Sequence, residues 1–258
     1  ADGWVVDSLD RPGPQEVMAA LRQVPEGGVW SLVGNEQAAS VLRDQADKLP
    51  DLRRPRILVG QPMDLPTMLA AGTGEALRFD FVLGRNLFAK VSERDALADV
   101  VACLLLPGGS ISLCENLPRR SQRLSEFLAG EAAAAAGVEL PPVLQKRYRQ
   151  AEEAVYHDAE DPVVNWDVPE LEAALAAAGL KVQTELTHFH REQLISAQQL
   201  ARWFENAPGT YVDRLRRHGL NDEELQSCRQ LLQRVFSTGP VTWTTSAVYI
   251  IASRDGVV

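Results

Sequence analysis

The sequence predicts an α/β fold with a doubly wound, mostly parallel sheet and helices on both faces. The segment from Phe79 to Leu113 is the clearest evidence. Phe79 to Leu83 is a short apolar run typical of a buried strand, and Gly84-Arg85-Asn86 breaks it. Apolar residues then recur at helical spacing from Glu93 to Leu106, Pro107-Gly108-Gly109 stops the helix, and a new strand begins at Ile111. Strand, helix and strand in this order predict a right-handed βαβ unit.

The same alternation precedes this unit. Helices are expected at Gln15 to Val24, Gln37 to Leu49 and Leu65 to Ala71, because apolar residues share one side of each. The strands expected between them are Trp4 to Ser8, Val29 to Val33 and Arg56 to Val59.

After Leu113 the pattern becomes mainly helical. Leu117 to Leu128 is predicted to be an arginine-rich helix, and an alanine run ending at Gly137 and a helix from Leu144 to Tyr156 follow. We expect a helical insertion over about residues 117–166 within a single domain that spans residues 1–258. Asp167 is predicted to cap a helix over Val168 to Ala178, with Gly179 at its end.

Two more strands complete the predicted sheet of seven strands. Leu180 to Leu186 is the sixth, and Thr242 to Ala252 is the last and should be antiparallel near an edge, because no helix follows it. Between them, helices are expected at Tyr211 to Arg217, at Asp222 to Phe236 and after Ser196, which should cap a helix carrying Leu200, Trp203 and Phe204.

Composition excludes several classes. The formal net charge is −9, which argues against a nucleic-acid domain with a basic footprint over the whole surface. No apolar run is long enough for a membrane span. The three cysteines are widely scattered and give neither a metal spacing nor a disulfide framework, and Cys103 is expected in the core. We therefore predict a cytoplasmic protein without membrane contact.

Local arginine clusters are candidate phosphate contacts, although solvated faces are the commoner role of such runs. They comprise Arg53, Arg54 and Arg56, then Arg119, Arg120 and Arg123, and finally Arg214, Arg216, Arg217 and His218. His188 and His190 alternate in a strand-like stretch without a carboxylate or cysteine at ligand spacing, so they are taken as surface residues.

The chain resembles class I S-adenosylmethionine-dependent methyltransferases over nearly its whole length. Phe79 to Leu83 and Leu104 to Gly109 are similar to that family's fourth strand and to the turn before its fifth. The resemblance implies a Rossmann-like seven-stranded fold with an antiparallel last strand, S-adenosylmethionine as cofactor and transferase activity.

A narrower resemblance rests on Gly84-Arg85-Asn86, on residues 118–124 and on residues 152–167. These segments are similar to an extra domain fused to some bacterial replication-associated recombination AAA+ ATPases. This resemblance implies an ATPase module in the same chain and a role in DNA recombination, with nucleic acid as a partner through the arginine clusters. It also implies that this chain is excised from a longer one.

The resemblance places the candidate cofactor residues at the ends of the strands. Leu9 and Arg11 occupy the first two glycine positions of the loop after strand one, and Val33 occupies the position of the acid that binds the ribose. The cofactor contacts are therefore degenerate, and we expect weak or absent binding. The candidate cofactor-binding residues are Asp7, Gly13, Glu36, Gln61, Met63, Gly84, Arg85 and Asn86.

Each candidate also has a structural interpretation. Asp7 can serve as a cap, Gly13 as a turn glycine before Pro14, and Arg85 and Asn86 as loop residues. Three hypotheses follow: an active methyltransferase with unusual contacts, an inactive methyltransferase-like interaction module beside an ATPase, and a nucleotide-binding protein that uses NAD. The last is weakest, because no G-x-G-x-x-G follows any predicted strand.

Overall fold

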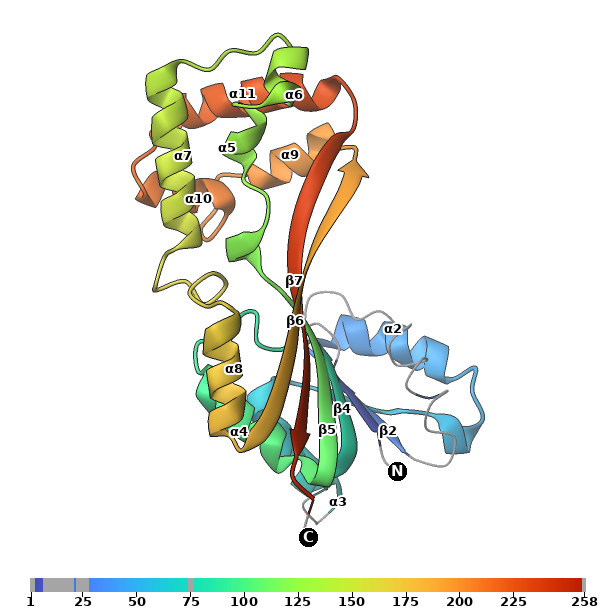
Figure 1. The fold of residues 1–258 in the computed structure, drawn as a ribbon. Coiled ribbons are helices and arrows are strands. Elements are labelled where there is room, and N and C mark those ends of the chain that lie inside the picture. Colours follow the sequence, from blue (N-terminus) through green and yellow to red (C-terminus); the bar gives the residue numbers. More distant parts are fainter. Residues whose placement is uncertain (1–2, 7–20, 22–27, 74–76, 257–258) are drawn as a thin grey trace. The chain divides into compact units, whose positions relative to one another are not determined.

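The structure is a computed structural model that describes residues 3–6, 21, 28–73 and 77–256. Its mixed sheet has the strand order β3-β2-β1-β4-β5-β7-β6 (Figure 1). β1 to β5 pair in parallel, and β7 is antiparallel to β5, as predicted. The strands are β1 Gly3–Val6, β2 Val29–Val33, β3 Arg56–Val59, β4 Phe79–Arg85, β5 Leu105–Asn116, β6 Leu180–Gln193 and β7 Val241–Arg254.

The structure differs from the prediction at the turn between the fourth and fifth strands. The helix α4 (Arg94–Cys103) ends before Leu104, and β5 already includes Pro107-Gly108-Gly109. Phe79 of β4 pairs with Leu105 and Phe81 pairs with Ser110, so Pro107-Gly108-Gly109 lies in an irregularity inside β5. A Cβ at Gly109 would lie 2.9 Å from the carbonyl oxygen of Leu106, which explains the glycine there.

Two further expectations in this region are wrong. β4 continues through Gly84 and Arg85, because both residues still pair with β5, and the strand breaks only at Asn86. Cys103 is exposed rather than part of the core, since α4 buries Leu97 and Val101 on its other side.

The chain divides into two compact units. Unit 1 comprises residues 1–116, 166–187 and 247–258, and unit 2 comprises 117–165 and 188–246. β6 and β7 have residues in both units, because β6 extends to Gln193, well beyond the predicted end at Leu186. The predicted helix over Gln15 to Val24 lies outside the described residues, apart from Leu21.

Unit 1 contains the parallel part of the sheet and helices packed on it. α4 contacts β5, and α4 and α8 (Val168–Ala177) contact each other (Figure 1); both helices have buried apolar residues. Asp167 caps α8 through its carboxylate, as predicted. The helical segments of this unit are α2 Glu36–Ala46, η1 Asp51–Arg53, η2 Pro62–Asp64, α3 Leu65–Thr73, α4 Arg94–Cys103 and α8 Val168–Ala177.

Unit 2 is mainly helical and has its own core, centred on Tyr148, Leu215, Leu232 and Val235. The predicted helix over Leu117 to Leu128 is wrong, because this stretch forms only two short turns separated by an extended Ser121. The helical segments are η3 Pro118–Arg120, α5 Leu124–Phe127, α6 Glu131–Ala135, α7 Pro142–Tyr156, α9 Ala197–Trp203, α10 Tyr211–Arg217 and α11 Asp222–Ser237. Among the described residues, no helix has the length and apolar character needed to cross a membrane.

Candidate functional site

The carboxyl ends of parallel strands in an open α/β sheet are where ligands bind, so the candidate site begins there. At the end of β2, Val33 is 1% exposed and packs with Ala38, Ala39 and Leu42. Its side chain therefore belongs to the core. Glu36, the displaced candidate for the ribose, begins α2, where its carboxylate forms an ion pair with Arg43 and is 70% exposed.

The end of β3 lies beside that of β2. The N–H of Gly60 donates to the carbonyl oxygen of Val33 at 3.0 Å. Gln61 follows as the N-cap of η2, and its side chain makes no capping hydrogen bond and is exposed. Met63 is half-buried. An exposed amide beside a thioether can contact a purine ring from its edge and its face.

The end of β4 carries Gly84, Arg85 and Asn86. Gly84 is buried, and a Cβ there would lie 2.8 Å from Cδ2 of Leu113 and 3.4 Å from Cδ2 of Leu87. Core packing thus accounts for this glycine without a ligand. Arg85 is exposed, and Asn86 has a left-handed backbone with φ of 51°.

Asn86 closes the end of the β4–β5 ladder. Its N–H donates to the carbonyl oxygen of Cys114 at 3.0 Å, and its side-chain Oδ1 accepts the N–H of Asn116 at 2.9 Å. Asn is one of the few residues other than glycine that adopt the left-handed conformation. Asn86 is therefore explained at least in part by the turn that it forms.

A buried carboxyl group fixes the loop after β4. Glu115 is fully buried; its Oε1 accepts the N–H of Leu87 at 2.7 Å, and its Oε2 accepts the N–H of Phe88 at 3.2 Å. Burial raises the pKa of Glu115 to about 8, against the opposing effects of these backbone N–H groups and of the Arg94 charge. The Glu115 side chain of β5 thus binds two consecutive backbone N–H groups of the loop after β4.

Arg94 and Trp166 lie near this carboxyl group. The Arg94 guanidinium lies 5.4 Å from the centroid of the Trp166 indole, and burial lowers the pKa of Arg94. Trp166 is 1% exposed, so it is a buried residue next to Asp167, the cap of α8. Its Nε1 is buried and lacks a hydrogen-bond partner among the described residues.

The predicted site residues fall into two groups at one edge of unit 1. Gln61 and Met63 follow β3, whereas Gly84 and Arg85 end β4 and Asn86 follows it, with β2 and β1 between β3 and β4. Three strand spacings separate these groups, or roughly 14 Å. Asp7 and Gly13, two further candidate cofactor residues, lie outside the described residues, as do Leu9 and Arg11.

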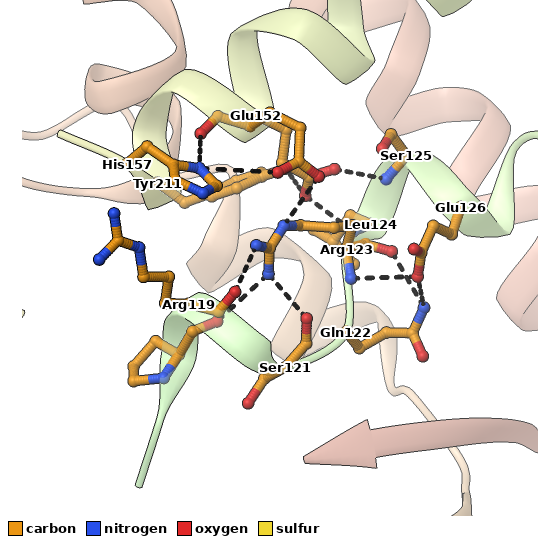
Figure 2. A network of polar contacts seen from close by, with 12 residues as sticks. Arg119, Ser121, Gln122, Arg123, Leu124, Ser125, Glu126, Glu152, His157 and Tyr211 are labelled. Carbon is orange, nitrogen blue, oxygen red and sulfur yellow. Dashed lines mark hydrogen bonds and ion pairs between the residues drawn. The ribbon is translucent and has the colours of Figure 1, made fainter. Parts of the chain in front are cut away.

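A second buried carboxyl group organises unit 2 in the same way. Glu152 accepts the N–H groups of Leu124 at 2.7 Å and Ser125 at 2.9 Å, and the Tyr211 hydroxyl donates to it at 2.5 Å (Figure 2). Burial raises the pKa of Glu152 and of Tyr211. Glu152 therefore supplies the first turn of α5 with the acceptors that its N-terminal N–H groups need.

Arg123 is not available to an outside partner, contrary to expectation. It is 6% exposed, and its guanidinium donates to the carbonyl oxygens of Pro118, Arg119 and Ser121 (Figure 2). It also pairs with Glu153 and lies 3.8 Å from the ring centroid of Tyr156. This arginine holds the irregular chain between β5 and α5 in place.

Sequence reasoning missed both buried carboxyl groups, although each left a signal. Glu115 follows Ile111 and Leu113 at alternate positions of a strand, so it belongs to the buried face. Glu152 follows Tyr148 by one helical turn on the buried side of α7. An acidic residue at an apolar position of either pattern predicts a buried carboxyl group with dedicated partners.

Other members of the arginine clusters are also engaged within the protein. Arg54 contacts Asp51, and Arg56 lies over the ring of Trp30. In the third cluster, each basic residue has an acidic partner: Arg214 with Asp161, Arg216 with Asp222, Arg217 with Asp213 and His218 with Asp158. Nucleic-acid binding by these clusters stays a prediction.

The two candidate histidines make strand-to-strand hydrogen bonds. Nδ1 of His188 lies 2.8 Å from the hydroxyl of Ser246, and Nδ1 of His190 lies 2.9 Å from that of Thr244. Across the part of the chain that the structure describes, no three His, Cys, Asp or Glu side chains gather as a metal site would require.

No family model and no curated protein matches the sequence. Solved structures do match the fold. A putative methyltransferase from Bacillus halodurans is 13% identical, with a TM-score of 0.52 over 98% of this chain and 93% of that one. The YcgJ protein from Bacillus subtilis is 14% identical, with a TM-score of 0.53 over 100% of this chain and 94% of that one. The chain has a methyltransferase-like fold. At these identities the likeness concerns the fold alone, and function depends on the site.

Proposed function

We propose that this chain is an S-adenosylmethionine-dependent methyltransferase-like domain whose cofactor contacts are degenerate. The likeness of its fold to the putative methyltransferase, over nearly the full length of both chains, carries the proposal. The domain would span residues 1–258, with a helical insertion at about residues 117–166.

The residues present fit the cofactor unevenly. At the adenine side, the exposed amide of Gln61 can contact the edge of the purine ring, and the half-buried thioether of Met63 can pack on its face. At the ribose side the fit fails, because Val33 is buried in the core and Glu36 is paired with Arg43.

The cost of the missing ribose contact sets the expected affinity. One charge-assisted hydrogen bond is worth about 1.5–3 kcal/mol, or roughly one to two decades of binding constant. A cofactor bound at low micromolar concentration by a complete site would then bind here at about 100 µM or more weakly.

Calorimetric titration of the full chain with S-adenosylmethionine and S-adenosylhomocysteine tests the proposal. Weak binding that Gln61→Ala reduces further, and that the control Gln37→Ala at an exposed position of α2 leaves unchanged, would support it. Binding that Gln61→Ala leaves unchanged would remove this amide from the site, and low micromolar binding would show that the contacts are not degenerate.

The ribose position also favours a second candidate function. A methyltransferase fold without an acid for the ribose can serve as a binding module, here beside an AAA+ ATPase and nucleic acid. Absence of binding by both cofactors at millimolar concentration, together with co-purification with such an ATPase, would favour this function. Val33→Asp is a poor test of either candidate, because it would place a carboxylate in the core.

A further inference from the structure

Unit 2 contains a pocket of about 380 Å³ whose described lining comes entirely from its own segments. The size lies within the range of small-molecule sites. Pro118 and Gln122 contribute from the chain before α5, Tyr156 from α7, Trp203 from α9 and Trp243 from β7. These segments are distant in sequence, so the pocket exists only in the folded unit.

Aromatic side chains form its distinctive walls. The rings of Trp203 and Trp243 have centroids 5.4 Å apart at an angle of 30°. Trp243 is also stacked on Phe127, with centroids 5.5 Å apart, so its indole is supported within the core. Tyr156 and Tyr211 complete the aromatic lining. Rigid ring faces of this kind bind other planar rings with little loss of conformational entropy.

Two larger hollows in the same unit lack this character. The first is lined by alanines, prolines and aliphatic residues around Gly130, and the second by polar residues around Lys146 and Arg149. Neither has an aromatic residue in its described lining. The aromatic pocket is therefore the better candidate for a specific organic ligand.

The polar groups of the pocket indicate which substituent the ligand carries. Nη1 of Arg214 lies 2.8 Å from Oδ2 of Asp161, and one such contact leaves further guanidinium N–H groups for an acceptor. The Tyr211 hydroxyl already donates to Glu152, and the amide nitrogen of Gln122 donates to Glu126 and to the Arg123 carbonyl. Arg214 thus has donors available to a ligand.

The donors around the aromatic walls disfavour a cation. The Arg123 guanidinium lies over the ring of Tyr156 and pairs with Glu153, and Arg214 lines the pocket and pairs with Asp161. These ion pairs add no net charge, but the remaining N–H groups of Arg214 can donate to an anionic oxygen and offer nothing to a quaternary ammonium group.

We propose that the aromatic pocket of unit 2 binds a planar aromatic ligand that carries an anionic oxygen substituent. The ring lies against Trp203 and Trp243, and the oxygen accepts from Arg214. This site is independent of the proposed cofactor site, and its test does not require the cofactor.

The probes are 2-naphthoate and its neutral isostere naphthalene-2-carboxamide, titrated into the full chain and followed by calorimetry. We expect 2-naphthoate to bind about tenfold more tightly than the carboxamide, because only the carboxylate forms a charge-assisted hydrogen bond. Arg214→Gln should remove this difference. Arg216→Gln should preserve it, because Arg216 is also ion-paired on α10 but does not line the pocket.

The ring contact has its own matched pair of variants. Trp203→Leu should weaken both probes by about tenfold, through loss of stacking and apolar contact. Tyr249→Leu, at an exposed aromatic residue of unit 1, should change neither. Thermal denaturation of each variant verifies folding, and the two probes compared on the unmodified chain give a result that requires no variant.

Three results would overturn the proposal: no binding of either probe at millimolar concentration, equal binding of the two by the unmodified chain, or equal losses in Trp203→Leu and Tyr249→Leu. Tighter binding of a naphthyl trimethylammonium salt than of 2-naphthoate would also contradict it, because it would reverse the inferred charge.

Discussion

Replacing Glu115 by Gln should loosen the loop that follows β4. The carboxyl group accepts one backbone N–H on each oxygen, from Leu87 and Phe88. A Gln side chain keeps one acceptor oxygen and places an amide N–H₂ against the other backbone donor. A buried N–H without an acceptor costs about 1–3 kcal/mol, and the free energy of unfolding of unit 1 should fall by about that amount at pH 5.

The pKa of Glu115 determines whether the Glu115→Gln variant is more or less stable than the unmodified chain at a given pH. The pKa of Glu115 is raised from 4.5 to about 8, so the folded protein holds a proton that the unfolded chain releases. The stability linked to this group is fully present below about pH 4.5 and is lost as the pH rises through about 8, by at most about 5 kcal/mol. Glu115→Gln does not titrate, so it should be less stable than the unmodified chain at pH 5 and more stable at pH 9.

Urea denaturation between pH 5 and pH 9 measures this crossing, and amide hydrogen exchange at Leu87 and Phe88 localises it. Glu93→Gln, at an exposed residue before α4, is the matched control and should follow the unmodified chain at every pH. A constant difference between the Glu115→Gln variant and the unmodified chain over this range would refute the reasoning. It would mean that the two N–H groups and Arg94 keep the carboxyl ionised throughout.

Two further substitutions test the account of the fold. Gly109→Ala should reduce stability by about 1–3 kcal/mol in urea denaturation, because its Cβ would lie 2.9 Å and 3.0 Å from the carbonyl oxygens of Leu106 and Phe79; Gly256→Ala, with no atom within 4 Å of its Cβ, should be neutral. Asp167→Ala should cost about 1 kcal/mol through loss of the α8 cap and increase amide exchange in the first turn of that helix, and unchanged exchange there would show that the cap is dispensable.

Local patterns allowed several elements to be predicted from the sequence. The strands Val29–Val33 and Arg56–Val59 and the helix Tyr211–Arg217 have the predicted bounds. Asp167 and Ser196 cap their helices as expected. These features depend on side chains within a few residues of one another, so the sequence contains their causes. The antiparallel last strand followed likewise from the absence of a helix after it.

Elements whose stability comes from distant residues were not predictable in this way. Pro107-Gly108-Gly109 has the composition of a helix stop, but β5 begins before it because Phe79 pairs with Leu105. The stretch from Leu117 to Leu128 has helical composition, yet the guanidinium of Arg123 and the carboxyl of Glu152 bind its backbone in an irregular path.

The candidate sites divide in the same manner. Sequence alone located Gln61 and Arg85 at strand ends, because those positions follow from the order of strands and helices. Only the tertiary structure showed that Val33 and Gly84 are packed in the core. It also showed that Glu115 accepts the N–H groups of Leu87 and Phe88, which are 28 and 27 residues away in the sequence. The pocket around Trp203 and Trp243 likewise required segments that are distant in the sequence to fold together. A hydrogen bond or a ring contact between distant residues depends on the path of the whole chain, and no local pattern of residue types records it.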